Sequence, residues 1–464
     1  MKKIGIIGGG FTGTMTAVHL IKHAESAFEI ITVYSEETFN RGIAFAPYSR
    51  THLLNVAAGK MSAFADSSEH FLDWVMKLPE FENKDRGLIA NSFLPRFLYG
   101  NYLNDVWKEA VAVAKAKNIQ LTMIHAMVEE LEVKNRFTMV LNSGKKIEVD
   151  YCVVATGNHM PRNPNIKSLN FYKSKHYFQN PWQLESVTGI DNNKPILIIG
   201  NGLTMVDTVM GLLEQKVHNE IYSISPNGFN ILPHRHSGLR YTKLVEELPA
   251  QINLFDFVKL INRHIKSVRE FGISAEPVID SIRPHTQQLW KRLSDREKSL
   301  FMSRLRHLWG VARHRIPMHI HEKIQKLRLD GMLHIQSGRI IDIKEEDGAI
   351  FFEYIDNKSK SRKLIEISRV INCTGPETDL SKLDNHFLKK CLVAGYISQD
   401  TLKLGIKTNT DTFEVVNSAG KEQTGLFTLG SNLKGELWES TAVNELRTQA
   451  EKLAQILLNK LESV

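Results

Sequence analysis

A glycine-rich loop near the start of the chain, Gly8-Gly9-Gly10-Phe11-Thr12-Gly13, constrains the fold more than any other feature. It follows an apolar stretch at residues 4–7 and precedes a helical pattern at residues 12–22, and another apolar stretch covers residues 30–34. This order predicts a parallel βαβ unit. In such a loop the first glycine permits a tight turn, the second lets backbone approach a pyrophosphate, and the third lets the helix pack on the strand. We therefore expect a dinucleotide to be bound here, by Gly8, Gly10, Phe11, Thr12 and Gly13.

The residue that holds the adenosine ribose is expected at the end of the second strand of such a unit, and it is usually a carboxylate. Here Tyr34 is followed by Ser35 and then by Glu36. Either Glu36 is displaced by one residue from the usual position, or Ser35 makes the contact instead. The remaining alternative is that Glu36 is a solvated loop residue.

A second glycine loop, Gly200-Asn201-Gly202-Leu203-Thr204-Met205, separates an apolar stretch at residues 195–199 from a helical pattern at residues 203–213. Met205 replaces the third glycine, so the helix must lie farther from the strand. Phosphate binding depends on the first two glycines and the helix N-terminus. We expect a second nucleotide at this loop, held by Gly200, Gly202, Leu203 and Thr204, with an inert turn as the alternative.

The choice of nicotinamide is left open by the segment after the next strand. A protein that prefers NADPH typically places an arginine there for the 2′-phosphate, but this chain has Ser225-Pro226-Asn227-Gly228. The second nucleotide is therefore NADPH or NADH, with NADH or a relaxed choice favoured by the missing arginine.

Two dinucleotide sites in one chain are the arrangement of a flavoprotein that passes hydride from a nicotinamide to FAD. The alternating strands and helices predict the α/β class, with two Rossmann-like dinucleotide-binding domains, the second inserted in the first, plus a helical segment. The predicted bounds are 1–165 for the first part of the FAD-binding domain, 190–332 for the NAD(P)-binding domain with a helical basic segment at 254–330, and 333–464 for the returning part of the FAD-binding domain.

Several kinds of chemistry lack their sequence signatures. The three cysteines form no CxxC pair, which argues against a disulfide scaffold and a redox dithiol; the chain also has no GxSxG and no P-loop motif. No metal is expected, because no suitably spaced carboxylates or thiols accompany the histidines at positions 234, 236, 314, 319 and 321. No stretch is apolar enough to span a membrane, so we expect a soluble protein without a membrane partner. The low cysteine content without CxxC pairs fits the reducing cytoplasm best.

The formal net charge of +8 is concentrated in one part of the chain. Residues 283–328 contain 12 Lys or Arg and 3 Asp or Glu, so the excess lies in the helical segment beside the second nucleotide loop. Charge confined in this way favours steering of an anionic cofactor or an acidic substrate over nucleic-acid binding.

Longer strings of residues carry a resemblance to a known family. Apolar stretches at residues 153–157 and 370–375 both end in Thr-Gly. The other strings are Arg41-Gly42-Ile43-Ala44-Phe45 and residues 52–62, 93–96, 99–103, 371–379 and 437–447. On these residues the chain resembles the two-dinucleotide-binding-domain flavoproteins, and among them bacterial NAD(P)/FAD-binding proteins related to flavin-containing and N-hydroxylating monooxygenases.

The resemblance implies roles for particular residues. Residues 8–13 would hold the FAD pyrophosphate, Val128 would meet the adenine through its backbone, residues 55–62 would lie along the flavin, and Gly430 with the helix near Ser440 would cap the isoalloxazine end. Ser431 stands where many relatives have an aspartate for the ribityl chain. The remaining cofactor-binding candidates are Arg41, Asn55, Met61, Ser62, Ala155, Thr156, Gly157, Glu439 and Thr441.

The resulting hypothesis is an FAD-dependent oxidoreductase reduced by NAD(P)H, most simply a monooxygenase acting through a flavin C4a-(hydro)peroxide on a small molecule, with an amine or amino acid suggested only by the N-hydroxylating relatives. His52 and Asn55 are the candidate catalytic groups near the flavin, with loop-fixing hydrogen bonds as the alternative. The alternatives in function are a flavin dehydrogenase or reductase without oxygen insertion, and a non-catalytic redox sensor. Substrate and O₂ are the expected partners, and the sequence sets no oligomeric state.

Overall fold

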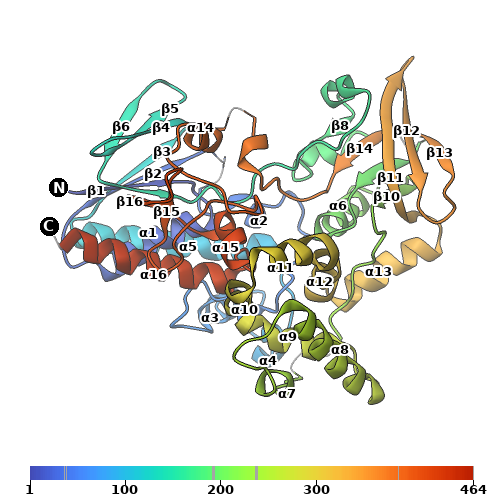
Figure 1. Cartoon of the computed structure of the whole chain (residues 1–464), viewed down its shortest axis with the longest axis horizontal. Coiled ribbons are helices and arrows are strands. Elements are labelled where there is room, and N and C mark those ends of the chain that lie inside the picture. Colours follow the sequence, from blue (N-terminus) through green and yellow to red (C-terminus); the bar gives the residue numbers. More distant parts are fainter. Residues whose placement is uncertain (36, 38, 191–193, 236–238, 385, 463–464) are drawn as a thin grey trace.

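Two β-sheets, one on each side of the molecule, carry the fold (Figure 1). The computed structural model describes residues 1–35, 37, 39–190, 194–235, 239–384 and 386–462. Strands from the first and last parts of the chain form one sheet and strands from the middle of the chain form the other, while a group of helices lies below and between them (Figure 1). The second unit is therefore inserted in the first, as predicted, and the predicted α/β fold class is confirmed.

The first sheet has six strands in the order β15-β16-β7-β1-β2-β3. All neighbours are parallel except β15 and β16. Ile7, the last residue of β1, lies opposite Val33 of β2 and Val154 of β7, so the ends of the three strands meet at one edge. The strands are β1 (Lys3–Ile7), β2 (Glu29–Tyr34), β3 (Gln120–His125), β7 (Tyr151–Val154), β15 (Glu414–Val416) and β16 (Glu422–Thr428).

Each face of the first sheet is covered by a separate apolar layer. Because side chains alternate along a strand, Ile4 and Ile6 pack with the helices α1 (Phe11–His23), α5 (Arg96–Ala116) and α16 (Val443–Glu462). Ile7 and Val33 pack on the opposite face, in a core with a three-stranded sheet and α14. That sheet consists of β4 (Val128–Val133), β5 (Phe137–Leu141) and β6 (Lys146–Val149), and α14 spans Phe387–Val393.

The second sheet has seven strands in the order β13-β12-β11-β10-β9-β14-β8. Its central pairs, β9 with β10 and β9 with β14, are parallel. Helices α6 (Leu203–Glu214) and α13 (Met318–Leu329) cover one face through Val206, Val209 and Ile320. The strands are β8 (Tyr177–Phe178), β9 (Ile196–Ile199), β10 (Ile221–Ser225), β11 (Leu333–Glu346), β12 (Ala349–Asp356), β13 (Arg362–Ile367) and β14 (Arg369–Asn372).

The strands of residues 333–372 correct the predicted domain bounds. The prediction placed them in the returning part of the first unit, but β11 pairs with β10 and β14 pairs with β9. Both pairings are parallel and continuous with the second sheet. The chain returns to the first sheet only with β15 and β16, after Asn372.

The helical segment lies between β10 and β11 in sequence, as predicted. Its helix α8 begins at Leu254, where the Asn253 side chain accepts a hydrogen bond from the Asp256 N–H, and α11 begins with a capping box between Ser294 and Glu297. The helices are α7 (Lys243–Glu246), α8 (Leu254–Glu270), α9 (Glu276–Ile282), α10 (Thr286–Arg292), α11 (Asp295–Leu300) and α12 (Arg306–Arg313), with a π-helical turn at Phe301–Leu305.

The remaining helices are short and lie in the connections. They are α2 (Gly42–Phe45), α3 (His70–Met76), α4 (Arg86–Ala90) and α15 (Lys434–Leu437), with 3₁₀ turns at Ala58–Lys60, Leu169–Lys173, Leu184–Ser186, Arg283–His285, Leu380–Lys382 and Gly430–Leu433. Within the part of the chain that the structure describes, no helix combines the length and the apolar character needed to cross a membrane.

Candidate functional site

The first glycine loop has the backbone geometry that its sequence predicts. Gly8 has φ +115°, and its N–H donates to the carbonyl oxygen of Val33 at 2.8 Å. A Cβ atom on Gly8 would clash with the carbonyl oxygen of Ala155, and one on Gly13 would clash with the carbonyl oxygen of Gly8. The first and third glycines are therefore required by the turn and by the close packing of α1 on the strand end.

The start of α1 is open to a ligand. Gly10 is the N-cap residue, no side chain caps the helix, and its first turn holds no acidic residue. A Cβ atom on Gly10 would have one neighbour within 4 Å among the described atoms, the Cα of Gly42 at 3.8 Å. The N–H groups of the first helical turn are thus bordered by bare backbone, which suits the close approach of a phosphate.

The second glycine loop repeats this geometry on the second sheet. Gly200 has φ +111°, its N–H donates to the carbonyl oxygen of Ile224 at 2.7 Å, and a Cβ atom on it would clash with the carbonyl oxygen of Cys373. Gly202 caps α6 without a side-chain hydrogen bond, and a Cβ atom there would meet no described atom within 4 Å. Met205, in place of the third glycine, is 1% exposed and packs in the core beneath the helix.

The two Thr-Gly stretches noticed in the sequence occupy equivalent places. Ala155 donates its N–H to the carbonyl oxygen of Ile7 at 2.8 Å, and Cys373 donates to that of Ile199 at 2.8 Å. Each stretch thus supplies the carbonyl oxygen that lies against the first glycine of its own loop. Thr156 and Gly157 follow directly, and Gly157 has φ +67°. The molecule therefore contains two copies of one strand-loop-helix arrangement.

The positions expected to bind the riboses lie at the ends of β2 and β10. Ser35 follows the last residue of β2 and is exposed, while Glu36 lies outside the described residues. At the corresponding end of β10, the side chain of Asn357 and the hydroxyl of Ser337 donate to the carbonyl oxygen of Pro226 at 2.8 and 3.0 Å. The turn after β10 is thus held by uncharged polar groups.

The C-terminal loop lies against the first glycine loop and presents an unpaired hydroxyl group. A Cβ atom on Gly430 would lie 3.1 Å from the Thr12 side chain, and the carbonyl oxygen of Gly430 accepts a hydrogen bond from Ser440 at 2.7 Å. Ser431 Oγ is buried without a hydrogen-bond partner among the described atoms. A buried hydroxyl without a partner is costly, and a ribityl hydroxyl of FAD would satisfy it.

The predicted catalytic residue His52 is engaged in packing between the two units. His52 is 1% exposed, and its Nε2 lies 3.0 Å from the carbonyl oxygen of Asp207 on α6. Burial lowers the pKa of His52, so the ring is neutral and donates this hydrogen bond. Arg96 adds a second link, because its guanidinium lies 2.9 Å from the Asp207 carboxylate. These contacts attach the loop at His52 to α6, which is the arrangement that the loop-fixing alternative predicts.

The other residues of the predicted flavin-side loop are fixed in a similar way. The carbonyl oxygen of Asn55 lies 3.3 Å from Nε2 of His234, and the carbonyl oxygen of Ser62 accepts a hydrogen bond from Arg447 of α16 at 2.8 Å. Ser62 and Met61 are buried. The loop is therefore attached to both units through its backbone carbonyl oxygens.

Three further candidates take structural positions. Arg41 donates to the side chain of Asn101 on α5 at 3.1 Å, and Val128 is buried at the start of β4. Glu439 is 8% exposed and accepts a hydrogen bond from Trp309 Nε1 at 2.9 Å, so it faces the helical segment. Thr441, two residues later, is exposed.

Part of the basic excess in the helical segment is neutralised by ion pairs. Arg283 lies 3.3 Å from Glu445, and Arg313 lies 3.9 Å from Glu439. Arg315, which is 3% exposed, pairs with Glu276 at 3.5 Å and with Asp280. These arginines attach the segment to α16 and to Glu439, or stabilise it internally, so their charges are already paired.

The described histidines among those weighed as metal ligands each have separate contacts. His234 pairs with Glu276 at 3.2 Å, and His314 lies 3.1 Å from the carbonyl oxygen of Gly310, whereas His319 is exposed. His321 lies near Gln325, and His236 falls outside the described residues. A different group, His19, His23 and Glu451, brings its ligand atoms within 4.8 Å of one another at the contact of α1 and α16.

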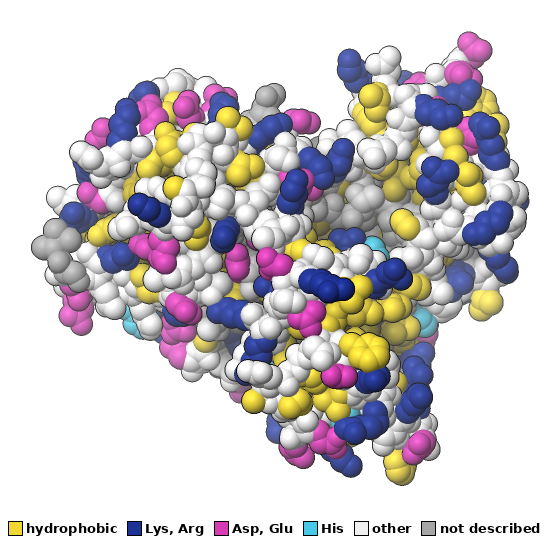
Figure 2. All heavy atoms as spheres, in the orientation of Figure 1, with side chains coloured by type: hydrophobic (Ala, Val, Ile, Leu, Met, Phe, Trp, Pro, Cys, Tyr) yellow, Lys and Arg dark blue, Asp and Glu magenta, His cyan; other side chains and the backbone are white. Residues whose placement is uncertain are grey.

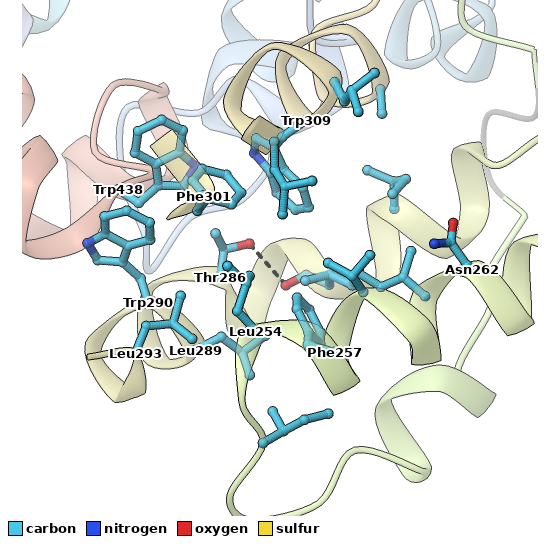
Figure 3. Close-up of a pocket in the computed structure, with 18 of the residues that line it drawn as sticks. Leu254, Phe257, Asn262, Thr286, Leu289, Trp290, Leu293, Phe301, Trp309 and Trp438 are labelled. Carbon is cyan, nitrogen blue, oxygen red and sulfur yellow. Dashed lines mark hydrogen bonds between the residues drawn. The ribbon is translucent and has the colours of Figure 1, made fainter. Parts of the chain in front are cut away.

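Sequence reasoning missed an apolar pocket in the helical segment (Figure 3). It lies among α8, α9, α10 and α12, with Trp438 at one end. Figure 2 shows hydrophobic side chains gathered on this face of the segment. The apolar residues at helical spacing in α8 indicate a buried or ligand-facing side of this helix. The positive charge of residues 283–328 indicates only an exposed surface.

Comparisons with known proteins agree with this geometry. Residues 5–159 match the family model described as FAD-NAD(P)-binding, and no curated protein sequence matches the chain. Among solved structures, the ornithine N-hydroxylase of Kutzneria sp. 744 is 12% identical with a TM-score of 0.65, and the L-lysine 6-monooxygenase of Pseudomonas syringae is 14% identical with a TM-score of 0.66. The bacillithiol disulfide reductase of Staphylococcus aureus is 13% identical with a TM-score of 0.56. Each comparison covers 99% of both chains, and at these identities the likeness establishes the fold of two-domain flavoproteins.

Proposed function

We propose that this chain, in which residues 5–159 form an FAD/NAD(P)-binding domain, is an FAD-dependent oxidoreductase that takes electrons from NAD(P)H and acts as a monooxygenase on a small molecule. The observation that carries the proposal is the duplicated loop geometry of Gly8 and Gly200, each beside an uncapped helix N-terminus. One such loop would serve FAD and the other the nicotinamide nucleotide.

The first loop and the residues around it suit FAD. The N–H groups at the start of α1 would bind the pyrophosphate, and Ser431 Oγ would bind the ribityl chain. Residues 55–62 and the turn at Gly430 would border the flavin, because Arg447 of α16 binds the carbonyl oxygen of Ser62 and Gly430 lies against Thr12 of α1. When bound, FAD supplies the electron acceptor and the site of O₂ reduction.

The second loop would bind NADH or NADPH at the start of α6. In this proposal the FAD-binding domain comprises the residues of the first sheet, and the NAD(P)-binding domain comprises those of the second sheet, residues 177–372. His52 and Arg96, which both contact Asp207 of α6, would act as positioning residues that set one site against the other.

The cysteines favour a monooxygenase over the thiol-disulfide chemistry named for the bacillithiol disulfide reductase. A reactive cysteine needs an exposed or low-pKa thiol, but Cys152, Cys373 and Cys391 are all buried. Burial raises the pKa of Cys373 and of Cys391 to about 12, so both stay protonated. None of the three can exchange with an external disulfide in this fold.

The overall reaction would consume one NAD(P)H, one proton and one O₂. One oxygen atom enters the substrate, the other leaves as water, and the two electrons come from the nicotinamide. The protein groups would bind and orient the partners and exclude water from the reacting atoms, which is the usual division of work in a cofactor enzyme.

Purified protein tests the proposal in two steps. It should be yellow or gain flavin absorbance with added FAD, and a colourless protein that takes up no FAD would exclude the enzyme function. A screen for substrate-stimulated NAD(P)H oxidation, with hydrogen peroxide measured in parallel, should then find a compound that incorporates ¹⁸O from ¹⁸O₂. Oxidation products without ¹⁸O would identify a dehydrogenase instead.

A further inference from the structure

The apolar pocket of the helical segment has the shape of a ligand site. Its cavity of about 250 Å³ is lined by α8, α9, α10, α12 and Trp438. This size is close to the lower end of the range for small-molecule pockets, at roughly 300 Å³. It reaches from Trp438 to Asn262, which lie at opposite ends of the view in Figure 3. Asn262 and Leu308 are exposed, so the pocket opens to the surface there.

Most polar atoms of the lining residues are turned away from the cavity. Trp309 Nε1 donates to Glu439 at 2.9 Å, and Trp290 Nε1 donates to the carbonyl oxygen of Gly435 at 2.7 Å. Thr286 Oγ1 donates to the carbonyl oxygen of Ile282 at 3.2 Å, the contact that is dashed in Figure 3. The remaining polar side-chain groups of the lining are the Asn262 amide, at the outer end, and the Trp438 indole N–H. The interior therefore offers a ligand apolar surface and aromatic faces.

A packed aromatic cluster closes the inner end. The rings of Trp290 and Trp438 are stacked, with centroids 5.1 Å apart, and Phe301 stands almost perpendicular to Trp438 at 5.1 Å. Such pairs fix one another in place. The inner wall is thus preformed.

The inner end also points toward the proposed flavin site. Trp438 lies two residues before Ser440, whose hydroxyl donates to the carbonyl oxygen of Gly430 at 2.7 Å. Gly430 itself lies against Thr12 of the first glycine loop. The short segment from Trp438 to Ser440 therefore connects the end wall of the pocket to the loop expected at the isoalloxazine end.

We propose that this pocket binds a neutral, elongated, largely hydrocarbon ligand with at most one hydrogen-bonding group, which lies at the Asn262 end. The packed aromatic cluster separates this ligand from the loop at Gly430, so the site is distinct from the place where a substrate would meet the flavin. An amino acid or alkyl diamine would place a charge among lining residues that carry none, at a large desolvation penalty. The pocket is therefore unsuited to a charged amine.

Calorimetric titration of the FAD-loaded protein with straight-chain alcohols tests the site without any turnover. From 1-hexanol to 1-octanol, the dissociation constant should fall about fourfold for each added methylene group, as expected for complete burial of each CH₂. 1,8-Octanediol should bind much more weakly than 1-octanol, because one hydroxyl would enter the apolar end, and L-lysine should not bind. Binding without chain-length dependence, or preferential binding of L-lysine, would overturn the proposal.

Two variants place the binding in this pocket. Ala312→Phe fills part of the cavity and should weaken 1-octanol binding by about tenfold or more, whereas Ala112→Phe, on the exposed face of α5, should leave it unchanged. Val258→Thr keeps the side-chain volume and adds a hydroxyl group to the lining, so it should weaken binding even if Ala312→Phe does not fold. Unchanged binding in a folded variant would overturn the assignment.

Other outcomes separate this inference from the proposed function. Failure of the alcohols to bind a protein that holds FAD and is reduced by NAD(P)H would overturn the apolar site alone. Tight alcohol binding by a protein that takes up no FAD would overturn the proposed function and support the apolar site. The alternative occupant of the pocket is a second copy of the chain, and sedimentation equilibrium tests for it. A dimer that 1-octanol dissociates would show that the second copy covers the pocket and would overturn the ligand site.

Discussion

The guanidinium of Arg96, at the start of α5, lies 2.9 Å from the carboxylate of Asp207 on α6, and both side chains are largely buried. The same arginine donates its Nε–H to the carbonyl oxygen of Leu53 at 2.9 Å. The neutral His52 ring binds the backbone of Asp207 from the same loop. Asp207 of the second unit thus contacts both Arg96 and His52 of the first unit, between the proposed nucleotide sites.

Arg96→Met should destabilise the protein by about 3 kcal/mol, because removing one partner of a buried ion pair leaves the other charge uncompensated. Urea denaturation measures this change. Lys108→Met, which breaks the exposed pair with Asp105 on the same helix, should change stability by about 0.5 kcal/mol or less. Adding Asp207→Asn to Arg96→Met should restore part of the loss. Equal effects of the two single variants would contradict the assigned role of Arg96.

Gly8→Ala and Gly200→Ala should affect different nucleotides. Both glycines have φ values that alanine rarely adopts, and in both a Cβ atom would clash with a carbonyl oxygen. Gly8→Ala should lose bound FAD, whereas Gly200→Ala should keep it, and the ratio of flavin absorbance to protein measures this. Gly310→Ala, in the open middle of α12, should behave like the wild type. Loss of FAD from Gly200→Ala alone would reverse the assignment of the two loops.

Ser431→Ala should weaken FAD binding by about fivefold, or about 1 kcal/mol, since it removes one hydrogen bond to the ribityl chain. Its stability without FAD should not fall, because Ser431 Oγ makes no hydrogen bond to the described protein atoms. FAD titration of the apoprotein gives the affinity. Ser359→Ala, at an exposed turn, is the matched control. An unchanged affinity in Ser431→Ala would place the ribityl chain elsewhere.

Stability should fall between pH 6.5 and pH 4 because of His19. Burial in α1 lowers the pKa of His19 from 6.5 to about 4, so the unfolded chain binds a proton at a higher pH than the folded protein does. Its full contribution is present above pH 6.5, and about 3 kcal/mol is lost as the pH falls to 4. His19→Met should flatten the pH profile of the unfolding free energy, and His319→Met, at an exposed position, should not. Parallel profiles would refute the role of His19.

The sequence predicted the features that depend on local geometry. Each glycine loop was identifiable because the turn and the helix N-terminus require glycine at fixed spacing, and the two Thr-Gly stretches were visible because their partner loops are alike. The bounds of the second unit were wrong because the strand pattern of residues 333–372 does not specify the neighbouring strands, and in the structure these are β9 and β10 of the second sheet.

Residues whose role depends on distant partners were the hardest to predict. His52 and Glu439 were identified as candidates, but their contacts to Asp207 and Trp309 join segments far apart in the chain. The apolar pocket is lined by four helices and Trp438, so no single segment of the sequence indicates it. The positive charge of residues 283–328 predicts an exposed surface instead. Two of those charges, on Arg283 and Arg315, form ion pairs that stabilise the position of the segment.

Anaerobic reduction of the flavin by NADH and by NADPH tests the central claim that the two loops serve two nucleotides of one redox reaction. The wild-type protein should be bleached at 450 nm by at least one of them, and Gly200→Ala, with its FAD retained, should be reduced about tenfold more slowly or worse at limiting nucleotide. The account would be contradicted if neither nucleotide reduced the flavin. It would also be contradicted if NADH or NADPH reduced the flavin of the Gly200→Ala variant at the wild-type rate.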